Sequence, residues 1–299
     1  KMRKLIFLIN PVAGTKSKEA LQKQVIRKTK KAGLPFEILP TQASGNYSFL
    51  IEKIHTENIT DVIVCGGDGS INQVAAALQG IPVHIGILPM GSGNGLARAA
   101  GIATGIGKAL DIIYRGKASY IDGFYINRHF SCMLCGLGFD AQVAHDFASQ
   151  STRGLATYIE QTIKNFFSVS SYPFIIHING EKIETPAFFI SVANSNQFGN
   201  NVTIAPKASI ADGLLDVVIV KKDYKLSILY ALFKQIIFGK VMPHIQKQNS
   251  RQKVHYYQVK ELQIENPALA PLHIDGEPAE TTNYFEIKIK ENAFKLLQP

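Results

Sequence analysis

The sequence predicts an α/β fold followed by a β fold: an N-terminal open sheet of parallel strands covered by helices, then a C-terminal antiparallel β-sandwich. Up to residue 118, short β-branched runs alternate with helical stretches, which is typical of parallel α/β sheets. From residue 119 onward strand follows strand, with turns such as Asn179-Gly180 that favour hairpins. We therefore expect two domains, residues 1–118 and 119–299, the last residues packing back on the first domain.

The first domain contains four β-branched runs that we predict as strands: Lys4–Ile9, Phe36–Leu39, Asp61–Cys65 and His84–Leu88. Four other stretches have helical periodicity: Lys18–Lys31, Tyr47–His55, Ile71–Leu78 and Leu96–Ala100. In parallel α/β sheets, ligands bind at the carboxyl ends of the strands. We therefore expect the chemistry in the loops after Ile9, Cys65 and Leu88.

The second domain is predicted to hold eight strands: Tyr120–Ile126, Arg128–Cys135, Phe174–Ile178, Ala187–Ala193, Leu214–Val220, Val254–Tyr257, Val259–Ile264 and Tyr284–Ile289. Two helical stretches interrupt them, Gly154–Phe167 and Leu226–Gly239. Sequential strands with few helices favour a sandwich over a second parallel sheet.

Composition is that of a globular protein, with 299 residues and 46% hydrophobic residues. No apolar stretch reaches the roughly 20 residues of a membrane-spanning helix, and the first apolar run is too short for a signal peptide. Three cysteines argue against a disulfide framework and favour a cytoplasmic location. The net charge of +9 fits an anionic partner. The basic residues are spread along the chain, which disfavours nucleic-acid binding.

The first loop runs from Asn10-Pro11 to Gly14 and leads into a Lys-rich helix. Proline and glycine shape a tight turn, and backbone amides near a helix start can hold a phosphate. An ordinary strand-to-helix turn is the alternative interpretation of this loop.

The second loop reads Gly66-Gly67-Asp68-Gly69-Ser70 and is the most specific signal in the chain. Three glycines allow the backbone to approach a ligand closely, and a helix N-terminus after Ser70 favours an anion. The carboxylate of Asp68 would suit a magnesium ion that bridges nucleotide phosphates.

The third loop repeats this design in Pro89-Met90-Gly91-Ser92-Gly93-Asn94-Gly95. Two neighbouring strand ends would then offer amides to one ligand, a stronger signal than either loop alone. No Gly-x-Gly-x-x-Gly follows the first strand, which disfavours a dinucleotide dehydrogenase.

These three loops, in this order and spacing, resemble the diacylglycerol kinase catalytic-domain family, which includes soluble bacterial lipid kinases and the sphingosine and ceramide kinases. Three more segments extend the resemblance to about residue 290: Gly136–Ala141, Asp212–Asp216 and Asp275–Glu277. The resemblance implies a two-domain, magnesium-dependent kinase that uses ATP at a membrane surface. It also implies the residues that touch ATP: Asn10, Pro11, Gly14, Thr41, Gly66, Gly67, Asp68, Gly69, Ser70, Gly91, Ser92 and Asn94.

The resemblance further implies that Asp68 organises the catalytic magnesium. Glu277 would be the general base that accepts the proton of a lipid hydroxyl, with support from Asp275. Asp212 would bind a second, structural magnesium ion, together with the backbone carbonyls of Ser209 and Leu214. From the residues alone, both acidic segments also read as ordinary Asp-Gly turns.

The acceptor is less defined than the reaction. Gly95 stands where diacylglycerol kinases usually have an aspartate, which leaves diacylglycerol-like and sphingoid lipids both open. The basic, apolar stretch Lys225–Lys240 would suit an anionic membrane surface or a buried core. A homodimer also stays open. Two rivals remain: a kinase of a soluble acceptor such as NAD, because Gly-Gly-Asp-Gly also occurs in NAD kinases, and an inactive nucleotide or lipid sensor.

Overall fold

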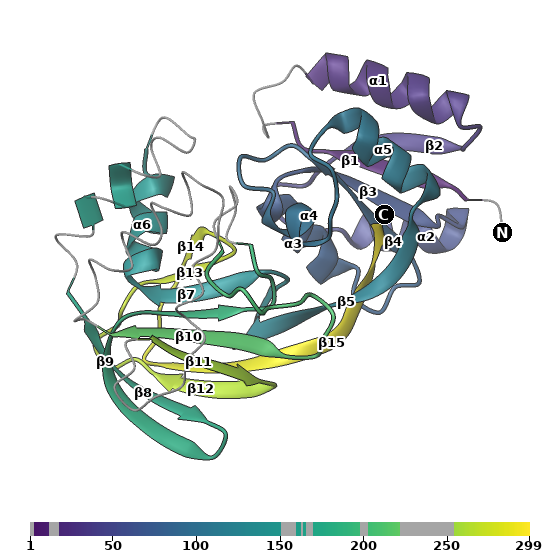
Figure 1. Ribbon diagram of the computed structural model, residues 1–299. Helices are drawn as coiled ribbons and strands as arrows, with labels where there is room; N and C mark the ends of the chain where they lie inside the picture. Colours follow the sequence, from purple (N-terminus) through teal and green to yellow (C-terminus); the bar gives the residue numbers. More distant parts are fainter. Residues whose placement is uncertain are drawn as a thin grey trace. The chain divides into compact units, whose positions relative to one another are not determined.

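The computed structural model describes residues 3–11, 18–150, 160–162, 164–165, 170–197, 203–221 and 254–299 (Figure 1). The chain divides into two compact units. One comprises residues 1–121 and 292–299, and the other comprises residues 122–291. Each unit is described by itself below.

The first unit contains a parallel sheet in the strand order β4-β3-β1-β2. Its strands are β1 (Leu5–Ile9), β2 (Phe36–Pro40), β3 (Asp61–Gly66) and β4 (His84–Pro89). Every residue of β1 is buried, as expected for a central parallel strand covered on both faces. Because β1, β3 and β4 run parallel, their carboxyl ends meet at one edge of the sheet.

Five helices follow these strands: α1 (Lys18–Lys31), α2 (Ser48–Glu57), α3 (Asp68–Ala77), α4 (Gly95–Ala99) and α5 (Ile106–Arg115). Helices α3 and α4 begin earlier than predicted, inside the glycine loops. Helix α5 was not predicted. It buries Ala109, Leu110 and Ile113 on one face and packs against β4.

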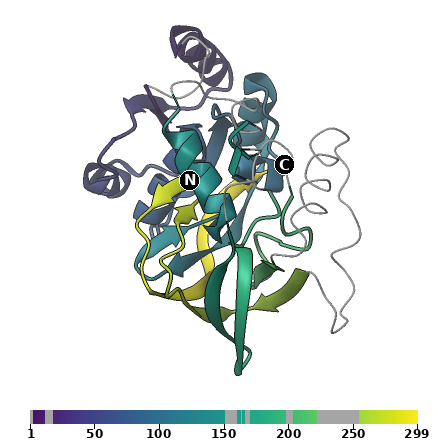
Figure 2. The same cartoon turned by 90° about the vertical axis from the view of Figure 1, so that its left-hand side faces the viewer.

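The second unit is built from antiparallel strands in the order β14-β13-β7-β9-β8-β12-β15, with β10 between β9 and β11. The strands are β5 (Lys117–Ile126), β6 (His129–Ser131), β7 (Leu134–Gly138), β8 (Tyr172–Ile178), β9 (Glu181–Ala193), β10 (Leu215–Lys221), β11 (Val254–Val259), β12 (Glu261–Glu265), β13 (Leu272–Ile274), β14 (Glu277–Ala279) and β15 (Tyr284–Gln298). Figure 2 shows the long hairpin of β8 and β9 that closes at Asn179-Gly180. The predicted fold class is confirmed.

Strand β10 is buried on both faces, which shows where the core of this unit lies. Val217 and Ile219 contact one apolar cluster, whereas Val218 and Val220 contact another. Side chains alternate along a strand, so β10 separates two layers of core.

Several elements of the second unit differ from the prediction, and strands β13 and β14 were not predicted. The predicted strand Arg128–Cys135 is two strands, β6 and β7, because the chain changes partners: β6 pairs with β5, and β7 pairs with β9 and β13. Helix α6 (Phe139–Ala148) was not predicted and begins inside the glycine motif Gly136–Ala141. Strand β15 is longer than predicted, and its last residues pair in parallel with β4 in the first unit. The predicted helices Gly154–Phe167 and Leu226–Gly239 lie largely or wholly outside the described residues.

Candidate active site

The glycine loops of the first unit meet at the carboxyl ends of β1, β3 and β4. The amide of Asn10 donates to the Cys65 carbonyl at 3.0 Å, and the amide of Met90 donates to the Gly66 carbonyl at 2.9 Å. The starts of the three loops predicted to carry the chemistry therefore lie side by side, the first loop being described only up to Pro11.

The contact between the first and second loops depends on the absence of a side chain at Gly66. The side-chain amide of Asn10 donates through Nδ2 to the Ser70 hydroxyl at 2.8 Å. A Cβ atom on Gly66 would lie 2.8 Å from Ser70 Cβ. Any side chain at Gly66 would therefore displace Ser70 from Asn10.

The second and third loops touch through backbone alone. A Cβ atom on Gly91 would lie 2.7 Å from the Cα atom of Gly67. Asn94 fixes the third loop, since its side chain accepts the Gly91 N–H at 2.9 Å and donates to the Gly91 carbonyl at 2.7 Å. Asn94 has a φ of 52°, a left-handed conformation that asparagine tolerates better than most residues.

Asp68 connects helices α3 and α4. Its carboxylate accepts the N–H groups of Gly95 at 3.1 Å and Leu96 at 3.3 Å, so it caps the start of α4. Burial raises the pKa of the Asp68 carboxyl above its ordinary value, while these backbone donors oppose the rise. Asp68 therefore holds the third loop in place in addition to any role toward a ligand.

The start of α3 fits a phosphate group. The first N–H groups of a helix have no partner within the helix and favour an anion. Gly69, in this first turn, has no atom within 4 Å of the position of an added Cβ. A ligand phosphate would have room in front of these amides.

The donor atoms in the described part of the chain limit how magnesium would be held. No three His, Cys, Asp or Glu side chains lie close enough together there to hold a metal ion. A magnesium ion at Asp68 would complete its oxygen shell with phosphate and water, which is how this ion is usually bound. The Asp68 carboxylate is a suitable oxygen donor for that arrangement.

The remaining nucleotide candidates differ in placement. Thr41 lies beside the end of β1, where its amide donates to the Ile9 carbonyl at 3.1 Å. Pro11 and Ser92 are exposed at the ends of their strands. Gly14 lies outside the described residues.

In the second unit, Glu277 follows the tight turn between β13 and β14. Asp275 and Gly276 form this turn with φ values of 52° and 80°. The Glu277 side chain is exposed, and its carboxylate has no hydrogen-bond or ion-pair partner among the residues that the structure describes. Its carboxylate is available to accept a proton.

Asp275 is turned into the protein instead. Its carboxylate accepts the Ser131 hydroxyl at 2.6 Å and the Leu134 N–H at 3.0 Å. Its own amide donates to the Leu134 carbonyl at 2.8 Å. Asp275 therefore anchors the turn that precedes Glu277.

Sequence reasoning did not identify His273, which is fully buried two residues before Asp275. It contacts Asp140, the acidic residue of the glycine motif, at 3.3 Å. The motif Gly136-x-Gly138-x-Asp140 was a visible signal for Asp140, but nothing in the sequence indicated its partner.

The predicted cation loop is also built around carboxylates. Asp212 accepts the N–H of Leu214 at 3.1 Å, and Asp122 accepts the N–H of Gly213 at 2.8 Å. Ser209 lies in the same loop. The loop could offer a cation one exposed carboxylate, from Asp212, and backbone carbonyls; Asp122 was not identified from the sequence.

The buried Asp216, at the end of this loop, is hydrogen-bonded to the partly buried Tyr256. The Tyr256 hydroxyl donates to Asp216 and accepts the Lys207 N–H at 3.2 Å. Burial raises the pKa of Asp216 to about 6, with a further contribution from the charge of Asp212.

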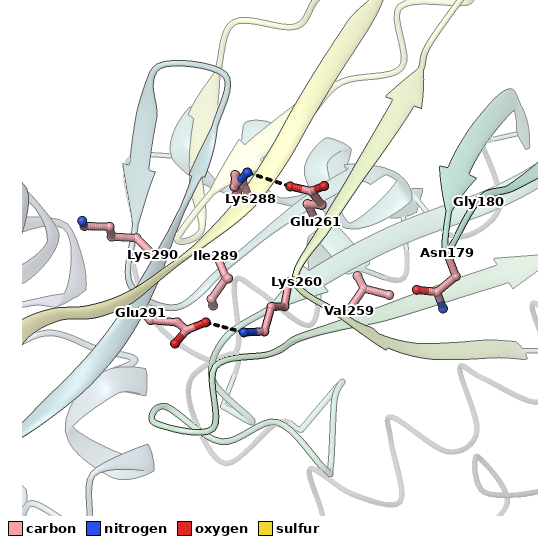
Figure 3. Close-up of a pocket in the computed structure, with 9 residues that line it drawn as sticks. All are labelled: Asn179, Gly180, Val259, Lys260, Glu261, Lys288, Ile289, Lys290 and Glu291. Atoms are coloured by element: carbon pink, nitrogen blue, oxygen red, sulfur yellow. Dashed lines mark hydrogen bonds and ion pairs between the residues drawn. The ribbon is translucent and has the colours of Figure 1, made fainter.

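A cavity of about 790 Å³ in the second unit contains none of the predicted site residues (Figure 3). Two ion pairs cross it, from Lys260 to Glu291 at 2.6 Å and from Lys288 to Glu261 at 2.8 Å. Figure 3 shows the Lys290 side chain pointing away from both pairs.

Both halves of the chain match known domain families. Residues 4–126 match the model of the diacylglycerol kinase catalytic domain. Residues 134–297 match the YegS C-terminal NAD kinase beta sandwich-like domain. In the described part of the chain, no helix has both the length and the apolar character needed to cross a membrane.

Similar proteins align over nearly the whole chain. A Shewanella frigidimarina protein named "Probable lipid kinase YegS-like" is 26% identical, covering 95% of this chain and 91% of its own. A Staphylococcus carnosus diacylglycerol kinase is also 26% identical, covering 92% and 89%.

Two solved structures from Bacillus anthracis share the fold. They have TM-scores of 0.83 and 0.74, identities of 20% and 18%, and each covers 100% of this chain and 98% of its own. Because both domain models match and the curated relatives align over nearly the whole chain, this chain belongs to the diacylglycerol kinase-like family of lipid kinases and is a phosphotransferase by family.

Proposed function

We propose that this protein transfers the γ-phosphate of ATP, with magnesium, to a hydroxyl group of a diacylglycerol-like or sphingoid lipid at a membrane surface. The observation that carries the proposal is the contact between Gly67 and Gly91 in front of the first turn of α3. This arrangement brings the first amides of α3 and Asp68 to one edge of the sheet, which supports binding of a triphosphate there.

The first unit would bind and orient the nucleotide. Amides at the start of α3 would hold phosphate oxygens, while Asn10 and Ser70 fix the neighbouring loop. Magnesium would neutralise negative charge on the phosphates, with Asp68 as its protein carboxylate. Phosphoryl transfer depends mostly on such positioning and charge stabilisation.

The second unit would supply the base. Glu277 is exposed and carries no ion pair within the described residues, so its carboxylate can accept the proton of the acceptor hydroxyl. Asp275 keeps the turn in place through Ser131 and Leu134. A base of this kind contributes about 10²- to 10⁴-fold in rate.

The lipid acceptor is supported by the family and by the net charge of +9, which favours contact with anionic lipids. The loop of Asp212 is a second candidate for magnesium, held by its carboxylate and by the carbonyls of Ser209 and Leu214. This ion would stabilise the loop and would take no part in the transfer.

The experiment is transfer of labelled γ-phosphate from Mg-ATP to lipids in mixed micelles. The panel contains diacylglycerol, monoacylglycerol, phosphatidylglycerol, sphingosine and ceramide, with NAD and a sugar phosphate as soluble acceptors. We expect label in one lipid class. Label in NAD or the sugar phosphate would replace the lipid proposal with a soluble-acceptor kinase, and ATP binding without any transfer would favour a sensor.

A further inference from the structure

A buried histidine and aspartate hold the turn that precedes Glu277. His273 lies in β13 with no exposed surface, and Asp140 lies in the first turn of α6 with 5% of its surface exposed. The Gly276 N–H donates to Nδ1 of His273 at 3.3 Å. On the other side of the ring, Nε2 of His273 lies 3.3 Å from Oδ2 of Asp140.

These contacts determine the protonation of the ring. A backbone N–H can only donate, so Nδ1 of His273 must accept and carries no proton. Nε2 therefore carries the proton and donates it to the Asp140 carboxylate. The imidazole is neutral, in the Nε2–H tautomer.

Asp140 is itself fixed at both oxygens. Its Oδ1 accepts the Ala141 N–H at 2.9 Å, while its Oδ2 accepts from His273. The positive end of the α6 dipole favours a carboxylate in this position. The pair also requires a glycine, because a Cβ on Gly136 would lie 2.0 Å from Asp140 Oδ2 and 2.5 Å from His273 Nε2.

The turn is thus held at two consecutive residues. The carboxylate of Asp275 is anchored by Ser131 and Leu134, and the amide of Gly276 is anchored by His273. Glu277 is the next residue. A buried polar pair generally adds little stability compared with apolar side chains of the same size, so its presence under this turn is better explained by positioning than by stability.

We infer that Asp140 and His273 form a positioning pair, which sets the direction of the Glu277 carboxylate by fixing the Gly276 amide. The inference rests on the proposed role of Glu277 as the base. His273 acts through Gly276 and does not itself touch the reacting atoms.

The test compares three substitutions. His273→Leu removes the acceptor for Gly276, while His273→Asn keeps an acceptor oxygen near the position of Nδ1. Asp140→Asn leaves one acceptor oxygen for two donors, Ala141 and His273. His177→Asn is the matched control, because His177 pairs with Glu265 at 2.8 Å elsewhere in the same unit.

Two readouts are independent of kinase activity. Long-range ¹H–¹⁵N NMR of His273 should show an unprotonated Nδ1 and a protonated Nε2. Hydrogen exchange at the Gly276 amide should accelerate about 10-fold or more in the His273→Leu protein and return toward wild type in the His273→Asn protein. Unchanged exchange in the His273→Leu protein, or the opposite tautomer, would overturn the inference.

The kinetic readout separates positioning from folding. We expect His273→Leu to lower kcat about 10- to 100-fold with the KM for ATP unchanged, because displacing a catalytic group by about 1 Å costs about that much. His273→Asn should recover most of the loss, and His177→Asn should have no effect. Normal kcat in the His273→Leu protein would refute positioning while the proposed function stands. If the wild-type protein transfers phosphate to no acceptor but its Gly276 amide is protected from exchange, the pair stabilises the turn and has no role in catalysis.

Discussion

Substitution of Gly91 by alanine tests whether the two glycine loops must touch. The added Cβ would lie 2.7 Å from the Gly67 Cα atom, whereas nonbonded carbon atoms prefer about 3.5–4.0 Å. The nearest atom belongs to the Gly67 backbone, which cannot turn aside as a side chain can, and the Asn94 side-chain oxygen also lies close, at 3.2 Å. The loops must therefore separate by about 1 Å. Overpacking of this kind costs about 1–3 kcal/mol of folding free energy.

The same displacement should weaken nucleotide binding. A shift of about 1 Å in groups that position a ligand lowers the efficiency of the reaction about 100-fold. We would measure the free energy of unfolding in urea and the affinity for Mg-ATP by calorimetry. We expect Gly91→Ala to reduce both.

Substitutions at two other glycines separate the effect on folding stability from the effect on ATP affinity. Gly69→Ala meets no atom within 4 Å, so the fold should keep its stability or gain about 0.4–1 kcal/mol. Its methyl group would nevertheless enter the space in front of α3 and reduce ATP affinity. Gly105→Ala, which also meets no atom, lies outside the loops and is the control. Unfolding free energy within 0.5 kcal/mol of wild type together with normal ATP affinity in the Gly91→Ala protein would refute the reasoning.

Three further predictions concern buried groups. The Arg3 guanidinium makes two hydrogen bonds to the fully buried Asp61 carboxylate. Asp61→Ala leaves this guanidinium without its anion and should lower the free energy of unfolding in urea by about 3–5 kcal/mol. A loss below about 1 kcal/mol would contradict a strong ion pair. Tyr256→Phe should cost about 1–3 kcal/mol through the loss of its bond to Asp216, whereas Tyr257→Phe, the control, should cost less; equal losses would show that the bond contributes nothing. All three cysteines are buried, and burial raises the pKa of the Cys65 and Cys135 thiols. Ellman's reagent should therefore label none of Cys65, Cys132 and Cys135 in the native protein and all three in urea, and rapid labelling of the native protein would contradict this packing.

Much of the first unit could be predicted from the sequence because its central strands are mostly apolar and fully buried. The run Leu5–Ile9 is buried at every residue, and Asp61–Gly66 follows the same pattern. Helix α5 was not predicted, although its buried residues Ala109, Leu110 and Ile113 recur with helical spacing. The split between β6 and β7 could not be predicted, since it arises where the chain changes strand partners.

The candidate site was predicted in part for a similar reason. Glycines mark where backbones approach closely, so the loops around Gly67 and Gly91 were visible in the sequence. The capping of α4 by Asp68 was not visible, because it joins residues 27 and 28 positions apart. His273 was hidden as well, since its partner Asp140 lies 133 residues away. Long-range polar contacts of this kind leave no periodic signal.

The most direct test of the proposed reaction is the initial rate of label transfer from Mg-ATP to the preferred lipid, in the wild-type protein and in two variants. Glu277→Gln removes the proposed base, and Glu280→Gln changes an equally exposed glutamate three residues away. We predict that Glu277→Gln lowers kcat about 10²- to 10⁴-fold while Glu280→Gln leaves it unchanged. Equal rates for the wild-type and Glu277→Gln proteins, or equal losses in both variants, would contradict the assignment of Glu277 as the base.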